Sequence, residues 1–340
     1  SLPGSIDSAA SWNAARMLVQ FAAIFYATAE ITRRDSVQEW IPTLFVAASA
    51  LSGLAAAESF IGGHIPTTMD AVVENSTVRR VSVGLPDANH QALLFLFALA
   101  FLLFTQEFWR GRVRVVFAAL SLVLVLAGLA LTMSRAAWLV FAVLVLVRLL
   151  LVRRRVWAVG IGVAAVLCAG APVSLIHPGL LDSVQRRILE LGRGGDTSVA
   201  SRVWHYTGVM DRALEGGPFG FGLDTAHEAV ANLEDPLGEK PAVTVHNVPL
   251  LLWLETGWVG LLCLGWLWSC LLAALYTAWR RAGPSAQDSG RVRAYAILMG
   301  TYGAVSLVMP FVYYSGFAIL LGCVIGAANA ALSRETPNPS

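Results

Sequence analysis

Charged side chains are scarce in this sequence: they make up 14% of its 340 residues, whereas 56% of the residues are hydrophobic. Soluble globular domains average about 25% charged residues, so an ordinary soluble enzyme or binding domain is excluded. The mean hydropathy of +0.65 is instead typical of a membrane protein that crosses the bilayer several times. Lysine is almost absent, because Lys240 is the one lysine among 24 basic residues.

Cysteine is also rare, and internal repeats, low-complexity tracts and a separate soluble domain are lacking. Each cysteine lies inside an apolar run, without the spacing of metal ligands. These residues are therefore interpreted as small core hydrophobes, and no disulfide framework is implied. The four cysteines are Cys168, Cys263, Cys270 and Cys323.

Long apolar runs dominate what is present, and they approach the roughly 20 residues that cross a bilayer as a helix. We predict an all-α fold, a polytopic membrane helix bundle that forms a single membrane domain over residues 1–340. Arginines flank both ends of 115–152, which indicates two crossings with a tight turn near Ser134-Arg135 instead of one long helix. The nine predicted spans are Ala14–Ala29, Ile41–Ile61, Gln91–Thr105, Val115–Ser134, Ala136–Val152, Val156–Ile176, Val248–Trp279, Ala294–Val312 and Tyr313–Leu332.

Basic residues in the connections set the expected orientation, since they favour the cytoplasmic side. They fall on alternate connections, so the opposite face holds 62–90, the turn at Arg135 and a long extracytoplasmic loop, 177–247. With nine spans the chain begins outside, yet residues 1–12 have neither the charged nor the apolar region of a signal peptide. We therefore expect the sequence to be a fragment that lacks an odd number of upstream spans.

The loop 177–247 is long for a simple connection, and its pattern predicts helices. Apolar residues from Leu180 to Leu191 recur at helical spacing, which indicates an amphipathic helix at the membrane interface. The glycines in 219–224 are not interpreted as a nucleotide loop, because no strand precedes them and no Gly-Lys-Ser/Thr follows. A tight turn that packs the loop against the membrane is expected there, followed by a short helix over 226–232. A second helix is expected to begin with an N-cap at Asp196, Thr197 or Ser198, to end at Gly216-Gly217-Pro218 and to carry Val199, Val203, Trp204, Met210 and Leu214.

Arginine is unusually frequent on the predicted outer face. Arg135 lies between two apolar spans, where an ionisable group is costly and marks a functional site; the alternative is an arginine that extends to the interface. For Arg202, in the second loop helix, the alternative is a solvated surface residue. Several arginines around one cleft would form a diphosphate site, because guanidinium binds phosphate oxygens in pairs and stays charged. The outer arginines are Arg79, Arg80, Arg135, Arg186, Arg187, Arg193, Arg202 and Arg212.

A His246-Asn247 pair lies where the loop meets the next apolar run. The ordinary pKa of histidine, near 6.5, suits a general base, and Asn247 can serve as its hydrogen-bonding neighbour; a structural histidine is the alternative. The run 248–279 would be about 48 Å long as one helix, which exceeds the bilayer core. The helix therefore either projects outward or breaks near Thr256-Gly257. Glu255 could then bind substrate or bond the backbone groups that such a break frees.

The arrangement resembles the O-antigen ligase and O-antigen polymerase family of bacterial membrane glycosyltransferases, over residues 79–332. The carrying motif is His246-Asn247, a gap of nine residues and then Gly257-Trp258-Val259-Gly260. Supporting motifs, in the family's order, are Thr132-Met133-Ser134-Arg135, Arg202-Val203-Trp204 with Pro218-Phe219-Gly220-Phe221-Gly222, and Arg80 with Gly84-Leu85-Pro86-Asp87-Ala88-Asn89.

The resemblance implies a glycosyltransferase of cell-envelope polysaccharide or lipopolysaccharide biosynthesis in the bacterial inner membrane, with its active face outside the cytoplasm. It implies an undecaprenyl-diphosphate-linked glycan as donor, a glycan, lipid A-core or protein as acceptor, membrane lipids as surroundings, and no metal, cofactor or nucleic acid. By carry-over, Arg135 and Arg202 hold the diphosphate, and His246 deprotonates or orients the acceptor hydroxyl. Arg80, Arg187, Asn247 and Glu255 are further candidates for substrate binding.

Several alternatives stay open. The family's Arg-x-x-x-Leu pattern fits Arg187 to Leu191 better than Arg202, so either arginine could be the second phosphate ligand. Ligase, repeat-unit polymerase and protein O-oligosaccharyltransferase share the donor chemistry. A transporter or flippase of lipid-linked glycans would favour internal repeats and charges near the bilayer midplane, and a membrane scaffold would make the Arg/His pattern a coincidence.

Overall fold

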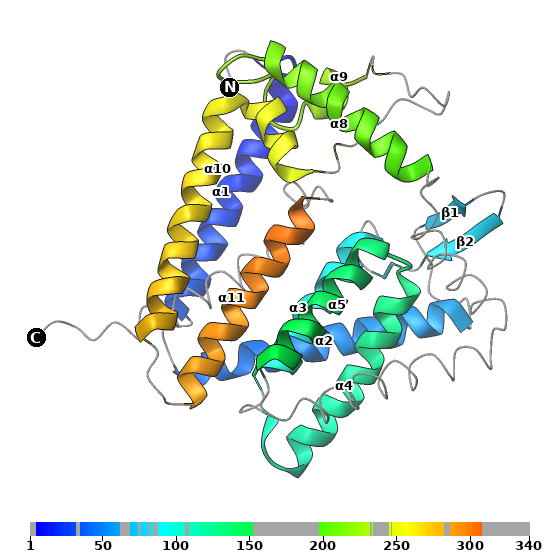
Figure 1. The fold of residues 1–340 in the computed structure, drawn as a ribbon, viewed down its shortest axis with the longest axis vertical. Helices are drawn as coiled ribbons and strands as arrows, with labels where there is room; N and C mark the ends of the chain where they lie inside the picture. The colour runs from blue at the N-terminus through cyan, green and yellow to red at the C-terminus, as the bar shows by residue number, and fades with distance from the viewer. Residues whose placement is uncertain are drawn as a thin grey trace, which may run out of the picture. The chain divides into compact units, whose positions relative to one another are not determined.

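The computed structural model describes residues 5–31, 35–61, 69–73, 76–80, 82–83, 88–105, 109–151, 197–231, 233, 245, 247–281 and 286–307. Helices make up most of these residues (Figure 1). In chain order the elements are α1 (Ser8–Ile31), α2 (Asp35–Ile61), β1 (Met69–Val73), β2 (Ser76–Arg80), α3 (Ala88–Phe104), α4 (Arg112–Leu131), α5 (Arg135–Leu151), α8 (Thr197–Glu215), α9 (Ala226–Ala229), α10 (Val248–Arg281) and α11 (Ala286–Ser306).

The helices lie where the sequence predicts membrane spans. Seven of the nine predicted spans fall at least partly on described residues, and there they coincide with α1, α2, α3, α4, α5, α10 and α11. Within the described part of the chain, three helical segments are long and apolar enough to cross a membrane: Pro42–Ile61, Arg112–Leu131 and Val248–Cys270. The total of nine spans stays a prediction, because Val156–Ile176 and Tyr313–Leu332 lie outside the described residues.

A short antiparallel hairpin departs from the predicted all-α fold. Strand β1 pairs with β2 in a register that places Met69 opposite Arg80 and Val73 opposite Ser76. The hairpin occupies the connection 62–90, to which the sequence analysis gave no regular structure. Its strands carry valine and threonine, which favour the extended conformation because they are branched at Cβ.

The chain divides into two compact units, one of Ser1–Thr32, Arg193–Arg281 and Ser306–Ser340 and the other of Arg33–Gly192 and Ala282–Val305. We call these unit 1 and unit 2. Helix α3 is the core of unit 2, because its leucine, phenylalanine and alanine residues are buried on almost every side. The ring of Phe45 on α2 packs against those of Phe97 and Phe101, with centroid distances of 6.2 and 5.9 Å. Gln91 Nε2 donates a hydrogen bond to Ser52 Oγ at 2.7 Å.

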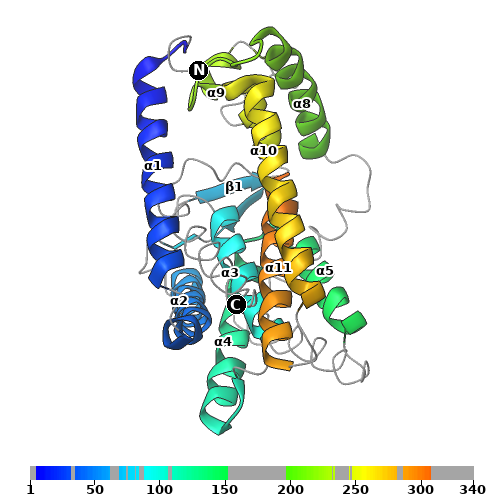
Figure 2. The same cartoon turned by 90° about the vertical axis from the view of Figure 1, so that its left-hand side faces the viewer.

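Two glycines allow α2 and α4 to cross at close range in unit 2 (Figures 1 and 2). A Cβ atom on Gly53 would overlap the carbonyl oxygen of Leu124, and one on Gly128 would overlap the ring of Phe95. Small residues at helix crossings are a common means of packing in membranes, where the van der Waals contact of two backbones replaces the hydrophobic effect.

A tight turn joins α4 to α5, as the sequence predicts. Met133 adopts a left-handed backbone conformation, with φ of 51°, and its side chain is buried. Thr132 Oγ1 and the indole N–H of Trp138 both donate to the carbonyl oxygen of Leu129, at 2.7 and 3.4 Å. The turn is therefore fixed by hydrogen bonds, and α5 begins directly at Arg135.

Candidate functional site

Helix α10 is broken at Gly257, which decides for one of the two alternatives that the sequence left open. Gly257 has φ of 67° and ψ of −171°, a conformation open mainly to glycine. A Cβ atom at this position would also overlap the carbonyl oxygen of Pro218. The break separates a short first segment, 248–256, from the long remainder, and it frees backbone groups that an intact helix would pair.

The loop 218–222 fills this break and pairs the freed groups. The N–H of Phe221 donates to the Leu254 carbonyl at 3.0 Å, and the N–H of Gly222 donates to the Glu255 carbonyl at 2.9 Å. Across the break, the N–H of Val259 donates to the Pro218 carbonyl at 3.3 Å. The glycines of this loop thus form a turn that packs on α10.

Gly220 is the matching glycine on the loop side. Its φ is 65°, and a Cβ atom there would lie 2.6 Å from the backbone of α10 at Glu255. The two backbones therefore interlock at Gly220 and Gly257, which fixes the direction of the segment 248–256.

Glu255 lies inside this interlock, and its side chain is only 1% exposed. Its Oε1 atom accepts the backbone N–H of Ala226, the first residue of α9, at 3.3 Å. A carboxylate is stabilised at a helix N-terminus because the first N–H groups lack partners within the helix. Glu255 therefore has a structural role, but it bonds the start of α9 instead of a backbone group freed by the break in α10. Its role in substrate binding stays a prediction.

Helix α8 has the predicted bounds, and the structure shows which of its residues are buried. His205, Val209 and Ala213 are buried; Val209 and Ala213 pack with residues of α9 and α10 in one hydrophobic cluster. Met210 and Leu214, which the sequence analysis placed among the apolar residues of this helix, are exposed. Valine and alanine let α8 approach α10 closely, so the smaller side chains form the contact.

Arg212 holds α8, α9 and the loop together. Its guanidinium lies over the Phe221 ring, 4.6 Å from the centroid, and its Nε donates to the Ala229 carbonyl at 3.2 Å. The same group forms an ion pair with Glu215. Arg212, one of the predicted outer arginines, therefore makes structural contacts within unit 1.

The N-terminal end of α1 also joins this loop within unit 1. The N–H of Ile6 donates to the Phe221 carbonyl at 3.0 Å, and Ser11 Oγ donates to the Leu223 carbonyl at 2.8 Å. Asp224 directly follows Leu223. Burial raises the pKa of the Asp224 carboxyl, His227 lowers this pKa, and the charge of Asp7 raises it further. Asp224 has φ of 57°, so it occupies a strained turn as well.

Asn247 caps the N-terminus of α10. Its Oδ1 accepts the N–H of Leu250 at 2.9 Å, and its Nδ2 donates to the Leu307 carbonyl at 3.1 Å. Such a cap contributes about 1 kcal/mol to helix stability. His246 itself lies outside the described residues, but its Cα atom is about 3.8 Å from that of Asn247 because the two are consecutive. The cap therefore fixes the position of the residue that follows the candidate base.

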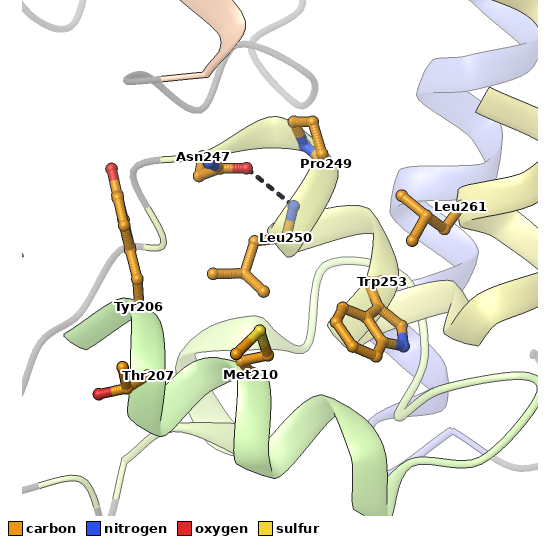
Figure 3. Close-up of a pocket in the computed structure, with 8 residues that line it drawn as sticks. All are labelled: Tyr206, Thr207, Met210, Asn247, Pro249, Leu250, Trp253 and Leu261. Atoms are coloured by element: carbon orange, nitrogen blue, oxygen red, sulfur yellow. Dashed lines mark hydrogen bonds between the residues drawn. The ribbon is translucent and has the colours of Figure 1, made fainter. Parts of the chain in front are cut away.

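A cavity of about 390 Å³ lies beside this cap, between α8 and the first segment of α10. Figure 3 shows Met210 of α8 and Leu250 of α10 approaching one another, with an aromatic residue on each helix beside them. The lining is almost wholly apolar. Its residues are Tyr206, Thr207, Met210, Asn247, Pro249, Leu250, Trp253 and Leu261. The sequence analysis missed this cavity, because its lining comes from two helices that are distant in the sequence.

A second cavity, of about 380 Å³, lies between α5 and α11 in unit 2. On α5 it runs from Leu139 to Val147, starting one helical turn after Arg135, and its lining is likewise almost wholly apolar. Ser134, just before α5, has a buried hydroxyl without a hydrogen-bond partner in the described part of the chain. On α11, a Cβ atom at Gly300 would meet no other atom within 4 Å.

The predicted arginines are placed only in part. Arg135 begins α5 and Arg80 ends β2, both in unit 2, whereas Arg202 belongs to α8 in unit 1. The side chains of these three residues, and all of Arg187 and His246, lie outside the described part of the structure. Asn247 and Glu255 lie together with α8 in unit 1. A shared cavity for Arg135, Arg202 and His246 therefore stays a prediction.

Comparison with known proteins adds one finding. Residues 120–265 match a family model described as O-antigen ligase. This range is narrower than the predicted 79–332, yet it includes all the candidate site residues except Arg80. A search of curated proteins finds no significant match.

Proposed function

We propose that the chain is a membrane enzyme of the O-antigen ligase type, which transfers a glycan from an undecaprenyl-diphosphate-linked donor to an acceptor hydroxyl. The reaction takes place on the outer face of the bacterial inner membrane, as in a ligase or a repeat-unit polymerase. The observation that carries the proposal is the family match, because it begins within α4, includes the turn before Arg135 and all of α8, and ends in α10 beyond its break.

The start of α5 is the proposed site for the diphosphate. Arg135 supplies a permanent positive charge, and the first N–H groups of a helix attract anions. The buried hydroxyl of Ser134 can donate a further hydrogen bond to a phosphate oxygen. The adjacent apolar cavity along α5 suits the hydrocarbon chain of such a donor. A charged end joined to an apolar groove matches a lipid diphosphate better than either feature alone.

The reaction that follows is a single displacement at the anomeric carbon. The acceptor oxygen forms a bond to this carbon while the bond from the carbon to the diphosphate oxygen breaks, and the diphosphate leaves with the electron pair. His246 takes the proton of the acceptor hydroxyl. Arg135, with Arg202 or Arg187, stabilises the negative charge that develops on the leaving group.

The test is glycan transfer by the purified full-length protein in vesicles, with an undecaprenyl-diphosphate-linked glycan as donor. Wild-type protein should form a new glycosidic bond, and Arg135→Ala should lose most of this activity and bind the donor more weakly. If Arg135→Ala transferred glycan at the wild-type rate, Arg135 would not be the residue that binds the donor diphosphate. Movement of the intact donor across the bilayer, with no new bond formed by wild-type protein, would instead identify a flippase.

A further inference from the structure

The part of α10 that follows the break has the length of one membrane crossing. The break at Gly257 changes the direction of the helix (Figure 1), Trp258 comes directly after it, and the next charged residue is Arg280. Residues 258–279 are about 33 Å long as a helix, which matches the roughly 30 Å of a bilayer's hydrocarbon core. With Arg280 at one membrane surface, Trp258 lies at the other, a level at which tryptophan is enriched.

The loop between α8 and α9 lies at the same level as Trp258. Both helices pack at the broken end of α10 (Figures 1 and 2). The N–H of Val259 donates to the Pro218 carbonyl at 3.3 Å, and Gly220 interlocks with the backbone of α10. Phe219 lies between these two loop residues, so its backbone is held at the membrane surface.

Three large apolar side chains are exposed around this interlock. Leu214 at the end of α8 is 65% exposed, Phe219 is 59% exposed and Trp258 is 51% exposed. The sequence predicts a turn in 219–224 that packs against the membrane, but the glycines of this turn pack on α10. Phe219 is therefore the residue at the start of the turn that faces outward.

Helix α8 separates its exposed apolar residues from its charged ones. Met210 and Leu214, four residues apart, lie on one exposed face, whereas Asp211 and Glu215 lie on the next face around the helix. Both faces differ from the face that is buried against α10. An exposed apolar face beside a charged face is typical of a helix that lies in the membrane interface.

The apolar face of α8 is continuous with the part of α10 that crosses the bilayer. Met210 lines the cavity beside α10 together with Leu261, which lies about one helical turn beyond Trp258. Leu262, the next residue, is exposed. A surface that continues from α8 onto residues inside the bilayer is covered by lipid.

We propose that Leu214, Phe219 and Trp258 form an interfacial anchor, which is inserted among the lipids of the leaflet at the broken end of α10. The anchor holds the break, and with it the segment 248–256, at the surface of the bilayer. This inference does not depend on glycan transfer, so its test leaves the proposed function unaffected.

The experiment measures the surroundings of single cysteines that carry an environment-sensitive fluorophore. In the full-length protein, with its four own cysteines replaced by alanine, Leu214→Cys and Phe219→Cys are the test positions. Both side chains are exposed, so these changes remove no core contact. Leu262→Cys is the reference for lipid, because it lies within the crossing and is exposed, and Glu228→Cys is the reference for water, because it is charged and exposed.

Each labelled protein is reconstituted in vesicles of phosphatidylethanolamine and phosphatidylglycerol. Quenching is measured with lipids that carry a nitroxide on the acyl chain, and separately with iodide on both sides of the membrane. We expect the labels at positions 214 and 219 to lose most of their fluorescence to the nitroxide lipids and little to iodide, as at position 262. The label at position 228 should show the reverse.

Three results would overturn the anchor. Iodide quenching at positions 214 and 219 as strong as at position 228 would mean that this surface faces water. Protection from both quenchers, with position 262 still quenched by lipid, would mean that protein covers it. Lipid quenching at only one of the two test positions would show that Leu214 and Phe219 do not insert together.

Discussion

Replacing Gly257 by alanine should open the interlock between α10 and the loop 218–222. Alanine at φ of 67° is strained, and its Cβ atom would overlap the Pro218 carbonyl oxygen. The loop must therefore move away, which breaks the hydrogen bonds that Phe221 and Gly222 donate to α10 and the one that Val259 donates to Pro218. The perturbation is confined to the backbone, because no functional side chain is removed.

The size of the effect follows from these contacts. Gly257 combines a positive φ with a ψ near 180°, a region that is essentially confined to glycine and costs a residue with a Cβ atom about 1–3 kcal/mol. Each backbone hydrogen bond contributes about 0.5–1.5 kcal/mol net. With three bonds at risk, we expect Gly257→Ala to lower the free energy of unfolding by about 3–7 kcal/mol. That is a large share of the roughly 5–15 kcal/mol by which proteins are stable.

The assay is unfolding of the purified full-length protein in detergent, with Gly265→Ala as control. Gly265 is also on α10, but a Cβ atom there meets nothing within 4 Å. Alanine should stabilise the helix at that position by up to about 1 kcal/mol, so the two substitutions should act in opposite directions. Equal stability of Gly257→Ala and Gly265→Ala would refute the interlock.

Two further substitutions test unit 2 and the outer loop. Gly300→Leu should fill the groove beside α5 and raise the donor KM about tenfold. The control, Gly300→Ala, should have a donor KM close to that of wild type. An equal donor KM in both variants would exclude the groove as the site of the donor's hydrocarbon chain. Asp224→Asn should raise the unfolding temperature at pH 7. The pKa of the Asp224 carboxyl is raised in the folded state, so its ionisation destabilises the fold as pH rises from the ordinary value of 3.8 through the raised one. The gain should therefore vanish below pH 3.8, and a gain independent of pH would contradict this explanation.

Local sequence signals predicted much of unit 1. The capping residues and the Gly216-Gly217-Pro218 stop gave the bounds of α8. The excess length of the run after Asn247 left two alternatives, a projecting helix or a break near Gly257, and the structure has the break. Each of these signals acts over a few residues or depends on length alone. For that reason they can be recognised in one sequence.

Contacts between distant segments could not be predicted in the same way. The burial of Val209 instead of Met210 depends on which face of α8 meets α10, and the pairing of Phe221 with Leu254 depends on the fold of the loop. The hairpin was missed because its two strands are short and lie between long apolar runs. The cavity beside Trp253 likewise arises only after α8 packs on α10.

The central claim is tested most directly by His246→Ala in the full-length protein, with glycan transfer and donor binding measured on the same sample. A general base contributes about 10²–10⁴-fold to the rate, so transfer should fall at least a hundredfold while the Kd of the undecaprenyl-diphosphate-linked donor stays at the wild-type value. Transfer at the wild-type rate, or loss of donor binding together with loss of transfer, would contradict the assignment of His246 as the acceptor base.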